Sequence, residues 1–245
     1  MQIAALLSIS SELGAAGIMP AVSNYAYLSG WCPEFGEEKI LERFGEFLAT
    51  VPFSESRPGF RHLVIRAVDS SEAPVLEQDL RAVPLDAAGV IEIVKDHLHS
   101  DSSYEVHADW DLWVFESDTA RWQLRPQGLQ LFCHGEDYDG GFWEENGHLQ
   151  VYFGFEHLFT GHARLLGIRQ MGQAPPQSPE EARFLASMAE PSNLRMYQEK
   201  TRENIRKLFD WVGRIEKAVP VKRLRLWSEG EENFEARLEE ILAAR

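Results

Sequence analysis

Residues 104–116 read YEVHADWDLWVFE, and apolar and polar side chains alternate along most of this stretch. A period of two is typical of a β-strand that buries one face and turns the other outward. The predicted buried face carries Val106, Ala108, Trp110, Leu112 and Val114. The predicted opposite face carries Glu105, His107, Asp109, Asp111 and Trp113. The middle of the chain is therefore its β-rich part.

Two further strands follow, and together the three predict an antiparallel meander over about residues 104–154. Residues 117–120 favour a turn, and the segments 129–134 and 148–153 resemble each other across the loop 135–147. If both connections close symmetrically, the residue numbers of two residues that face each other on paired strands add up to a constant. This sum is about 237 for the first strand pair and about 282 for the second. Pro126 and Gly128 favour a bulge or a sheet edge, and a slip of one residue would exchange the two faces.

Helices are predicted both before and after these strands in the sequence. Apolar stripes indicate helices within 36–51, after Asp86, from Ser178, within 191–219 and near the end of the chain, while 3–7, 60–68 and 221–227 favour strands. We predict an α+β fold: an antiparallel sheet of about five to seven strands with helices packed on one side and a helical C-terminal region. The expected units are 1–172 and 173–245, packed together as one body and joined by the Pro-rich residues 173–179.

The charge is strongly acidic and uneven. The formal net charge is −15, and residues 92–160 alone hold 14 acidic but only 3 basic side chains. Such a field repels nucleic acid and anionic membranes and favours a basic protein partner, although acidity that serves only solubility explains it as well. No apolar run approaches the length of about 18 residues that spans a membrane. No Lys or Arg precedes the apolar residues 3–7, unlike in a signal peptide, so we expect a cytoplasmic protein.

A partner surface is predicted on the polar sheet face and the loop 135–147. Aromatic anchors among charges are typical of protein interfaces, and this region holds two such tryptophans. The candidate contact residues are Asp109, Asp111, Trp113, Asp137, Asp139, Trp143, Glu144 and Glu145. In the alternative interpretation a helix covers Trp113 and Trp143 only fixes its own loop.

The main alternative is a metal-assisted hydrolase. The predicted register sets His134 opposite His148, and with Asp137 or Asp139 they could hold a divalent metal such as zinc that activates water. Otherwise these histidines belong to a half-solvated sheet face and bond to carboxylates. Cys32 and Cys133 are the only cysteines, which excludes an all-cysteine zinc site and a disulfide scaffold. No GxSxG, GxxxxGK[ST] or GxGxxG motif occurs, so no cofactor is predicted for the favoured, non-enzymatic interpretation.

In size, acidity and expected fold class the chain resembles bacterial toxin-immunity proteins. The resemblance rests on these general properties and assigns a role to no residue. It implies an inhibitor that neutralises a basic toxin or effector by covering a cationic active site.

Overall fold

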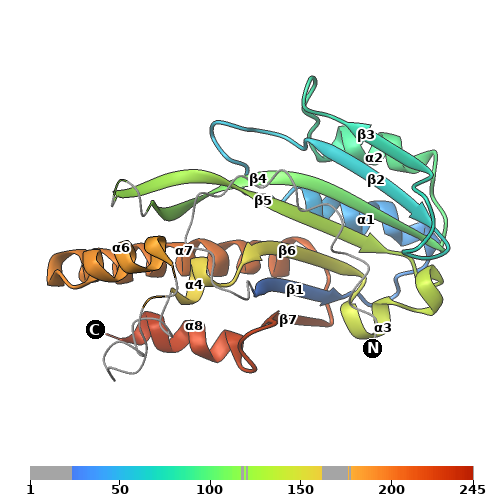
Figure 1. Ribbon diagram of the computed structural model, residues 1–245. Coiled ribbons are helices and arrows are strands. Elements are labelled where there is room, and N and C mark those ends of the chain that lie inside the picture. Colours follow the sequence, from blue (N-terminus) through green and yellow to red (C-terminus); the bar gives the residue numbers. More distant parts are fainter. Residues whose placement is uncertain (1–23, 117–118, 120, 162–175, 177, 245) are drawn as a thin grey trace.

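The computed structural model describes residues 24–116, 119, 121–161, 176 and 178–244, and these form one seven-stranded antiparallel sheet with helices against it (Figure 1). The strands are β1 (Tyr25–Trp31), β2 (His62–Ala67), β3 (Leu76–Asp79), β4 (Ser102–Glu116), β5 (Arg121–His134), β6 (Leu149–Phe155) and β7 (Arg223–Ser228). The α-helices are α1 (Glu37–Leu48), α2 (Ala87–Lys95), α3 (Trp143–Asn146), α4 (His157–Thr160), α6 (Pro179–Met188), α7 (Pro191–Ala218) and α8 (Phe234–Ala243). The predicted α+β class is confirmed.

The strand order is β3-β2-β4-β5-β6-β1-β7. Strands β4, β5 and β6 are consecutive in the chain and adjacent in the sheet, as a meander requires, but β6 pairs with β5 only from Gln130 to Cys133. Beyond β6 the sheet continues with β1, which the sequence did not predict, and with β7. The strand predicted at residues 3–7 lies outside the described residues.

The predicted register is confirmed in both strand pairs. Strands β4 and β5 pair without interruption from Glu116 opposite Arg121 to Ser103 opposite His134, so every pair sums to 237. Strands β5 and β6 pair with sums of 282. The bulge expected near Pro126 is absent, because Pro126 pairs in register with Asp111. The alternative, a sheet edge, is what occurs: this part of β5 extends past its pairing with β6, where a residue without an N–H is tolerated.

The core lies between the sheet and the helices behind it in Figure 1. The Trp110 ring of β4 lies 5.4 Å from the Trp211 ring of α7 and 5.9 Å from the Phe153 ring of β6. The Trp211 indole also donates to Thr50 Oγ1 over 2.9 Å. The apolar stripe predicted within 191–219 therefore packs in the core, where Ile205, Leu208 and Ile215 are also buried. The division into 1–172 and 173–245 stays a prediction.

A second apolar cluster lies at the far end of the β4–β5 hairpin. Phe115, on the face of β4 opposite Trp110, contacts Phe184 of α6 and Tyr197 of α7 at ring distances of 5.6 and 6.4 Å. The hairpin end is thereby joined to the two helices that follow the predicted linker.

Helix α7 also serves as an edge partner of β4, because β2 pairs with β4 only as far as His107. The Asn204 amide donates to the carbonyl oxygens of Trp113 (2.9 Å) and Leu158 (3.0 Å) and accepts from the Trp113 N–H (2.8 Å). The Lys207 ammonium donates to the carbonyl oxygen of Asp111, two residues before Trp113 in β4, over 2.8 Å. Asn204 is 1% exposed, so these bonds satisfy backbone groups that water cannot reach.

Replacing Asn204 by Leu is expected to lower the free energy of unfolding by about 2–4 kcal/mol, since three buried backbone groups lose their partner. Urea denaturation of the full chain measures this change. The matched control is Gln198→Leu on an exposed position of the same helix, where the change should stay below about 0.5 kcal/mol. A loss below about 1 kcal/mol for Asn204→Leu would contradict the edge role.

Candidate functional site

The loop 135–147 is held at the end of the sheet between two buried histidines. The backbone N–H of His134 donates to the His148 carbonyl over 2.8 Å, which confirms the predicted pairing. The His134 ring lies among the rings of Phe132, Tyr138 and Phe142 at centroid distances of 5.8, 5.7 and 4.9 Å. The imidazole thus packs against aromatic rings on the polar face of the sheet, and its Nδ1 is hydrogen-bonded to the Ser103 hydroxyl over 3.0 Å.

A stack of three rings extends from the core to the surface. The His148 imidazole lies 4.3 Å from the Phe35 ring on one side and 4.3 Å from the Trp143 ring on the other, at interplanar angles of 29° and 11°. Phe35 and His148 are buried, whereas Trp143 is partly exposed and ends the stack. His148 Nδ1 accepts the backbone N–H of Cys32 (3.1 Å), which leaves the ring proton on Nε2. The stack therefore joins the segment before α1 to the loop.

Further contacts fix the same junction. The Trp31 indole donates to the Glu144 carbonyl and the Trp143 indole to the Glu136 carbonyl, each over 3.1 Å. Gly147 adopts a φ of 90°, and a Cβ at this position would lie 2.8 Å from the backbone N and O of Gly30. Only glycine allows this close approach of the loop to β1.

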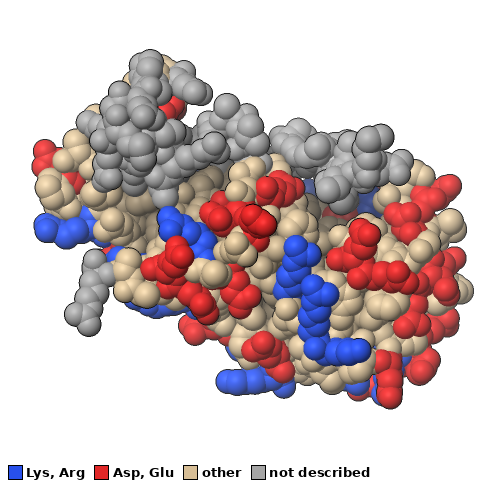
Figure 2. Space-filling view, turned by 90° about the horizontal axis from the view of Figure 1, so that it is seen from below, with Lys and Arg blue, Asp and Glu red and all other residues tan. Residues whose placement is uncertain are grey.

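This junction brings two acidic segments together into one surface, which we call the acidic end. It comprises the exposed residues Glu34, Glu37, Glu38, Glu136, Asp137, Asp139, Glu144 and Glu145. Figure 2 shows acidic side chains gathered at the right-hand end of the molecule, where α3 lies in Figure 1. Among the described residues, no Lys, Arg or His forms an ion pair with any of the eight.

The sequence predicted four of these acidic-end residues and their neighbour Trp143, but its list of contact residues lacked Glu136 and missed Glu34, Glu37 and Glu38. The two segments are about 100 residues apart in the chain. The pairing of β1 with β6 and the ring stack, neither of which a short-range pattern encodes, bring them together. The hydroxyls of Ser100 and Ser70 donate to Asp137 (2.6 Å) and Asp139 (3.3 Å), and both residues remain exposed.

The predicted sheet-face residues do not belong to the acidic end. Asp109 is 3% exposed and lies 3.5 Å from the guanidinium of Arg61 and 3.9 Å from that of Arg57. Its carboxylate is thus already paired within the fold. Burial raises the pKa of Asp109, although both arginines act to lower it. Asp111 accepts the Glu55 N–H over 3.0 Å.

Trp113 is partly covered. The Lys200 ammonium lies 3.8 Å from the centre of the Trp113 ring, so α7 covers one face of the ring, as the alternative interpretation predicted.

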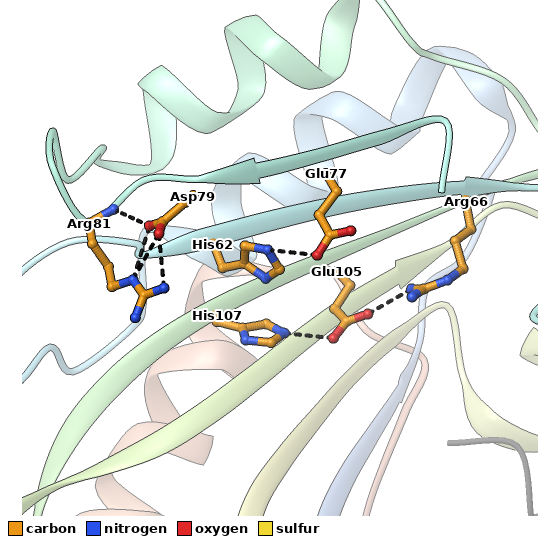
Figure 3. Close-up of polar contacts among 7 residues, drawn as sticks. All are labelled: His62, Arg66, Glu77, Asp79, Arg81, Glu105 and His107. Atoms are coloured by element: carbon orange, nitrogen blue, oxygen red, sulfur yellow. Dashed lines mark hydrogen bonds and ion pairs between the residues drawn. The ribbon is translucent and has the colours of Figure 1, made fainter. Parts of the chain in front are cut away.

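A second polar arrangement crosses β2, β3 and β4 (Figure 3). Glu105 accepts from the His107 Nε2 over 2.6 Å and from the Arg66 guanidinium over 2.9 Å. The His107 ring meets the His62 ring edge to face at 5.0 Å, and His62 pairs with Glu77 over 3.4 Å. Burial raises the pKa of Glu105, but the contacts with His107 and Arg66 outweigh it, so the pKa is lowered overall and Glu105 is ionised at neutral pH.

This network is self-contained. Glu105 and Arg66 neutralise each other on the sheet face, His107 bonds to the same carboxylate, and His62 contacts His107 and Glu77. We therefore assign it to the stability of the sheet rather than to partner contact.

The predicted metal ligands are not brought together. His134 and His148 lie among aromatic rings, whereas Asp137 and Asp139 bond to serines on the outer side of the loop. Across the described residues, no group of three or more His, Cys, Asp or Glu side chains has the geometry of a metal site.

Both histidines are neutral in the folded protein at neutral pH. Burial lowers the pKa of His134 to about 3, with a smaller contribution from His148, and burial lowers the pKa of His148 to about 4. Protonation of either ring would place a charge among aromatic side chains. The loop that carries five of the eight acidic-end residues is thus held by groups that must stay uncharged.

Compared with known proteins, the chain matches no family model, no curated protein and no solved structure. Fold and site alone therefore define it: an α+β protein with a preformed acidic surface at one end of its sheet. Within the described part of the chain, none of the helices combines the length and the apolar character needed to cross a bilayer.

Stability is expected to fall on acidification below pH 6.5. Each histidine has its ordinary pKa of about 6.5 in the unfolded chain and a lower pKa when folded, so the unfolded state takes up protons first. The stabilisation is complete above the unfolded pKa and is lost as the pH falls toward 4, by about 2 kcal/mol per histidine at pH 5.

Urea denaturation at pH 7.5, 6.5, 5.5 and 5.0 measures this dependence for the wild type, for His148→Gln and for the control His99→Gln at an exposed position. His148→Gln should reduce the slope by up to about 1.4 kcal/mol per pH unit, and the control should not. Equal slopes in the two variants would contradict the buried, neutral state of His148.

Glu105→Gln is expected to lower the free energy of unfolding by about 2–4 kcal/mol, because Arg66 and His107 remain partly buried without their carboxylate. Glu77→Gln is the matched control, since Glu77 also contacts a histidine but is exposed, and its loss should stay below about 0.5 kcal/mol. Equal losses in thermal unfolding would contradict the assignment of a stabilising role to this network.

Proposed function

We propose that the protein is a non-enzymatic binding module that captures a basic protein partner through the acidic end. The observation that carries this proposal is the set of eight exposed carboxylates without ion pairs among the described residues, held on a rigid base of stacked rings. On the sheet face, by contrast, the buried Asp109 and Glu105 are paired with arginines, so their charges are not available to a partner.

A preformed surface favours binding because little conformational freedom is lost on association. The acidic loop is anchored at both ends by His134 and His148. It is joined to the segment before α1 by the bond of the Trp31 indole to the Glu144 carbonyl and by the stack of Trp143, His148 and Phe35. Clustered charges of one sign also accelerate encounter with an oppositely charged partner.

Trp143 is the proposed anchor at the centre of this contact. Its indole ends the ring stack at the surface and is followed directly by the exposed Glu144 and Glu145. A partially exposed aromatic ring beside carboxylates suits the side chain of an arginine or lysine, which can stack on the ring and pair with the acids. Trp143 also fixes its own loop through the Glu136 carbonyl, which is the role that the alternative interpretation gave it, and this contact leaves the ring partly exposed for a partner.

The particular role we propose is that of an immunity-type inhibitor in the cytoplasm. The partner would be a basic toxin or effector, and binding would block its cationic active site by covering it and by charge. Nucleic acids and anionic membranes are unsuitable partners for a chain with a net charge of −15. Acidity that serves solubility alone is the competing explanation, and it predicts no dependence on where the charges lie.

The test compares two variants of equal net charge. In the first, Glu136, Glu144 and Glu145 are replaced by Lys. In the second, Glu232, Glu235 and Glu239, which are exposed in or next to α8 and far from α3 in Figure 1, are replaced by Lys. Each protein is used as bait in native-host lysate at low and high salt, and retained proteins are identified by mass.

We expect wild type and the α8 variant to retain the same basic protein stoichiometrically at low salt and to lose it at high salt. The acidic-end variant should bind the purified partner at least about tenfold more weakly, mainly through slower association. Equal retention by both variants, or no basic protein on the wild type, would contradict the proposal.

A further inference from the structure

A small hollow lies between the last residues of β4, the first residues of β5 and the start of α7. These parts of the three elements lie at the other end of the molecule from α3 (Figure 1). It has a volume of about 230 Å³. The hollow is lined by Phe115, Arg121, Trp122, Asn193 and Met196. We call it the hairpin hollow.

Aromatic side chains make one wall of the hairpin hollow. The Trp122 ring lies 5.5 Å from the Phe115 ring and 5.2 Å from the Tyr197 ring, and Phe115 is supported from behind by Phe184. This wall belongs to the second apolar cluster and is therefore fixed by the packing of the hairpin against α6 and α7. It offers apolar, ring-shaped contact surface to an occupant.

The opposite wall comes from α7. The Asn193 amide donates to the carbonyl and hydroxyl oxygens of Ser187, which fixes its orientation. Met196 is 50% exposed, and its unbranched side chain can adjust to an occupant. The hollow thus combines a rigid aromatic wall with an adaptable apolar one.

Among the described residues that line the hairpin hollow, Arg121 is the only one with a charged side chain. Its cross-strand neighbour is Glu116, but that carboxylate pairs with Arg125 and accepts from Gln123 (2.8 Å) and Thr119 (3.1 Å). Among the described residues no carboxylate forms an ion pair with the exposed Arg121 guanidinium. The Arg121 guanidinium beside the aromatic wall is therefore available to bind the negatively charged group of a ligand.

We propose that the hairpin hollow binds a small organic carboxylate with a single aromatic ring, independently of partner binding at the acidic end. The ring contacts Trp122, Phe115 and Met196, and the carboxylate pairs with Arg121. A volume of about 230 Å³ is below the range of about 300–1,000 Å³ for drug-sized ligands, so one ring with a short side chain is the size that fits.

The experiment uses the full chain labelled with ¹³C in its five methionine methyl groups and titrated with phenylacetate. Met196 is assigned by Met196→Leu, and Met188, which is buried in the same cluster but does not line the hollow, is the internal reference. The Met196 methyl signal should shift progressively with a Kd in the millimolar range, as expected for a ligand of about ten heavy atoms. Phenylacetamide, which lacks the charge, should bind at least about fivefold more weakly.

Arg121→Gln should weaken phenylacetate binding at least about fivefold, whereas Arg195→Gln, an equal loss of charge at an exposed position of α7 outside the lining, should not. No shift of Met196 at 50 mM, on the order of ten times the expected Kd, would overturn the proposal, as would equal binding of the amide or equal effects of the two arginine variants. A peptide with a C-terminal phenylalanine that binds more than about tenfold tighter than phenylacetate would also overturn it, because the ligand would then be a chain terminus.

Discussion

The pairing of β4 with β5 is the constraint on which the rest of the structure depends. It continues without interruption from Ser103 opposite His134 to Glu116 opposite Arg121. The face on which each β4 side chain lies therefore also fixes the face of the β5 side chain opposite to it. One face of the pair supplies Trp110 and its neighbours to the core, and the other carries the polar network and Asp109. A slip by one residue would put carboxylates into the core, so burial of Trp110 fixes the register.

The same register determines where the loop 135–147 begins and ends. It sets His134 beside His148, and each imidazole is then neutral because aromatic side chains replace water around it. The Phe35–His148–Trp143 stack converts this local arrangement into a contact between distant segments. The acidic end is thus a consequence of core packing, although its own residues are all exposed.

Charges fall into two groups in this fold. On the sheet face, Glu105 and Asp109 are buried and each is matched by arginine, because a buried carboxylate without a partner is strongly destabilising. At the acidic end, water solvates the carboxylates, so mutual repulsion is tolerable and no internal partner is required. The hairpin hollow is the reverse case: Glu116, which faces Arg121 across the strands, pairs with Arg125, and no other carboxylate of the described residues forms an ion pair with Arg121.

The sequence by itself determined the alternation of residues 104–116, both strand registers and the helical stripe of α7, because these depend on local periodicity. It also identified the acidic loop, since the charges are contiguous there. Tertiary structure alone decided that Asp109 is paired with arginines while Glu34, Glu37 and Glu38 join the loop. It also decided that His134 and His148 are enclosed by rings rather than by the carboxylates of Asp137 and Asp139. The physical reason is that charge partners and ring stacks form between segments distant in sequence, and no periodic pattern records which side chains meet there.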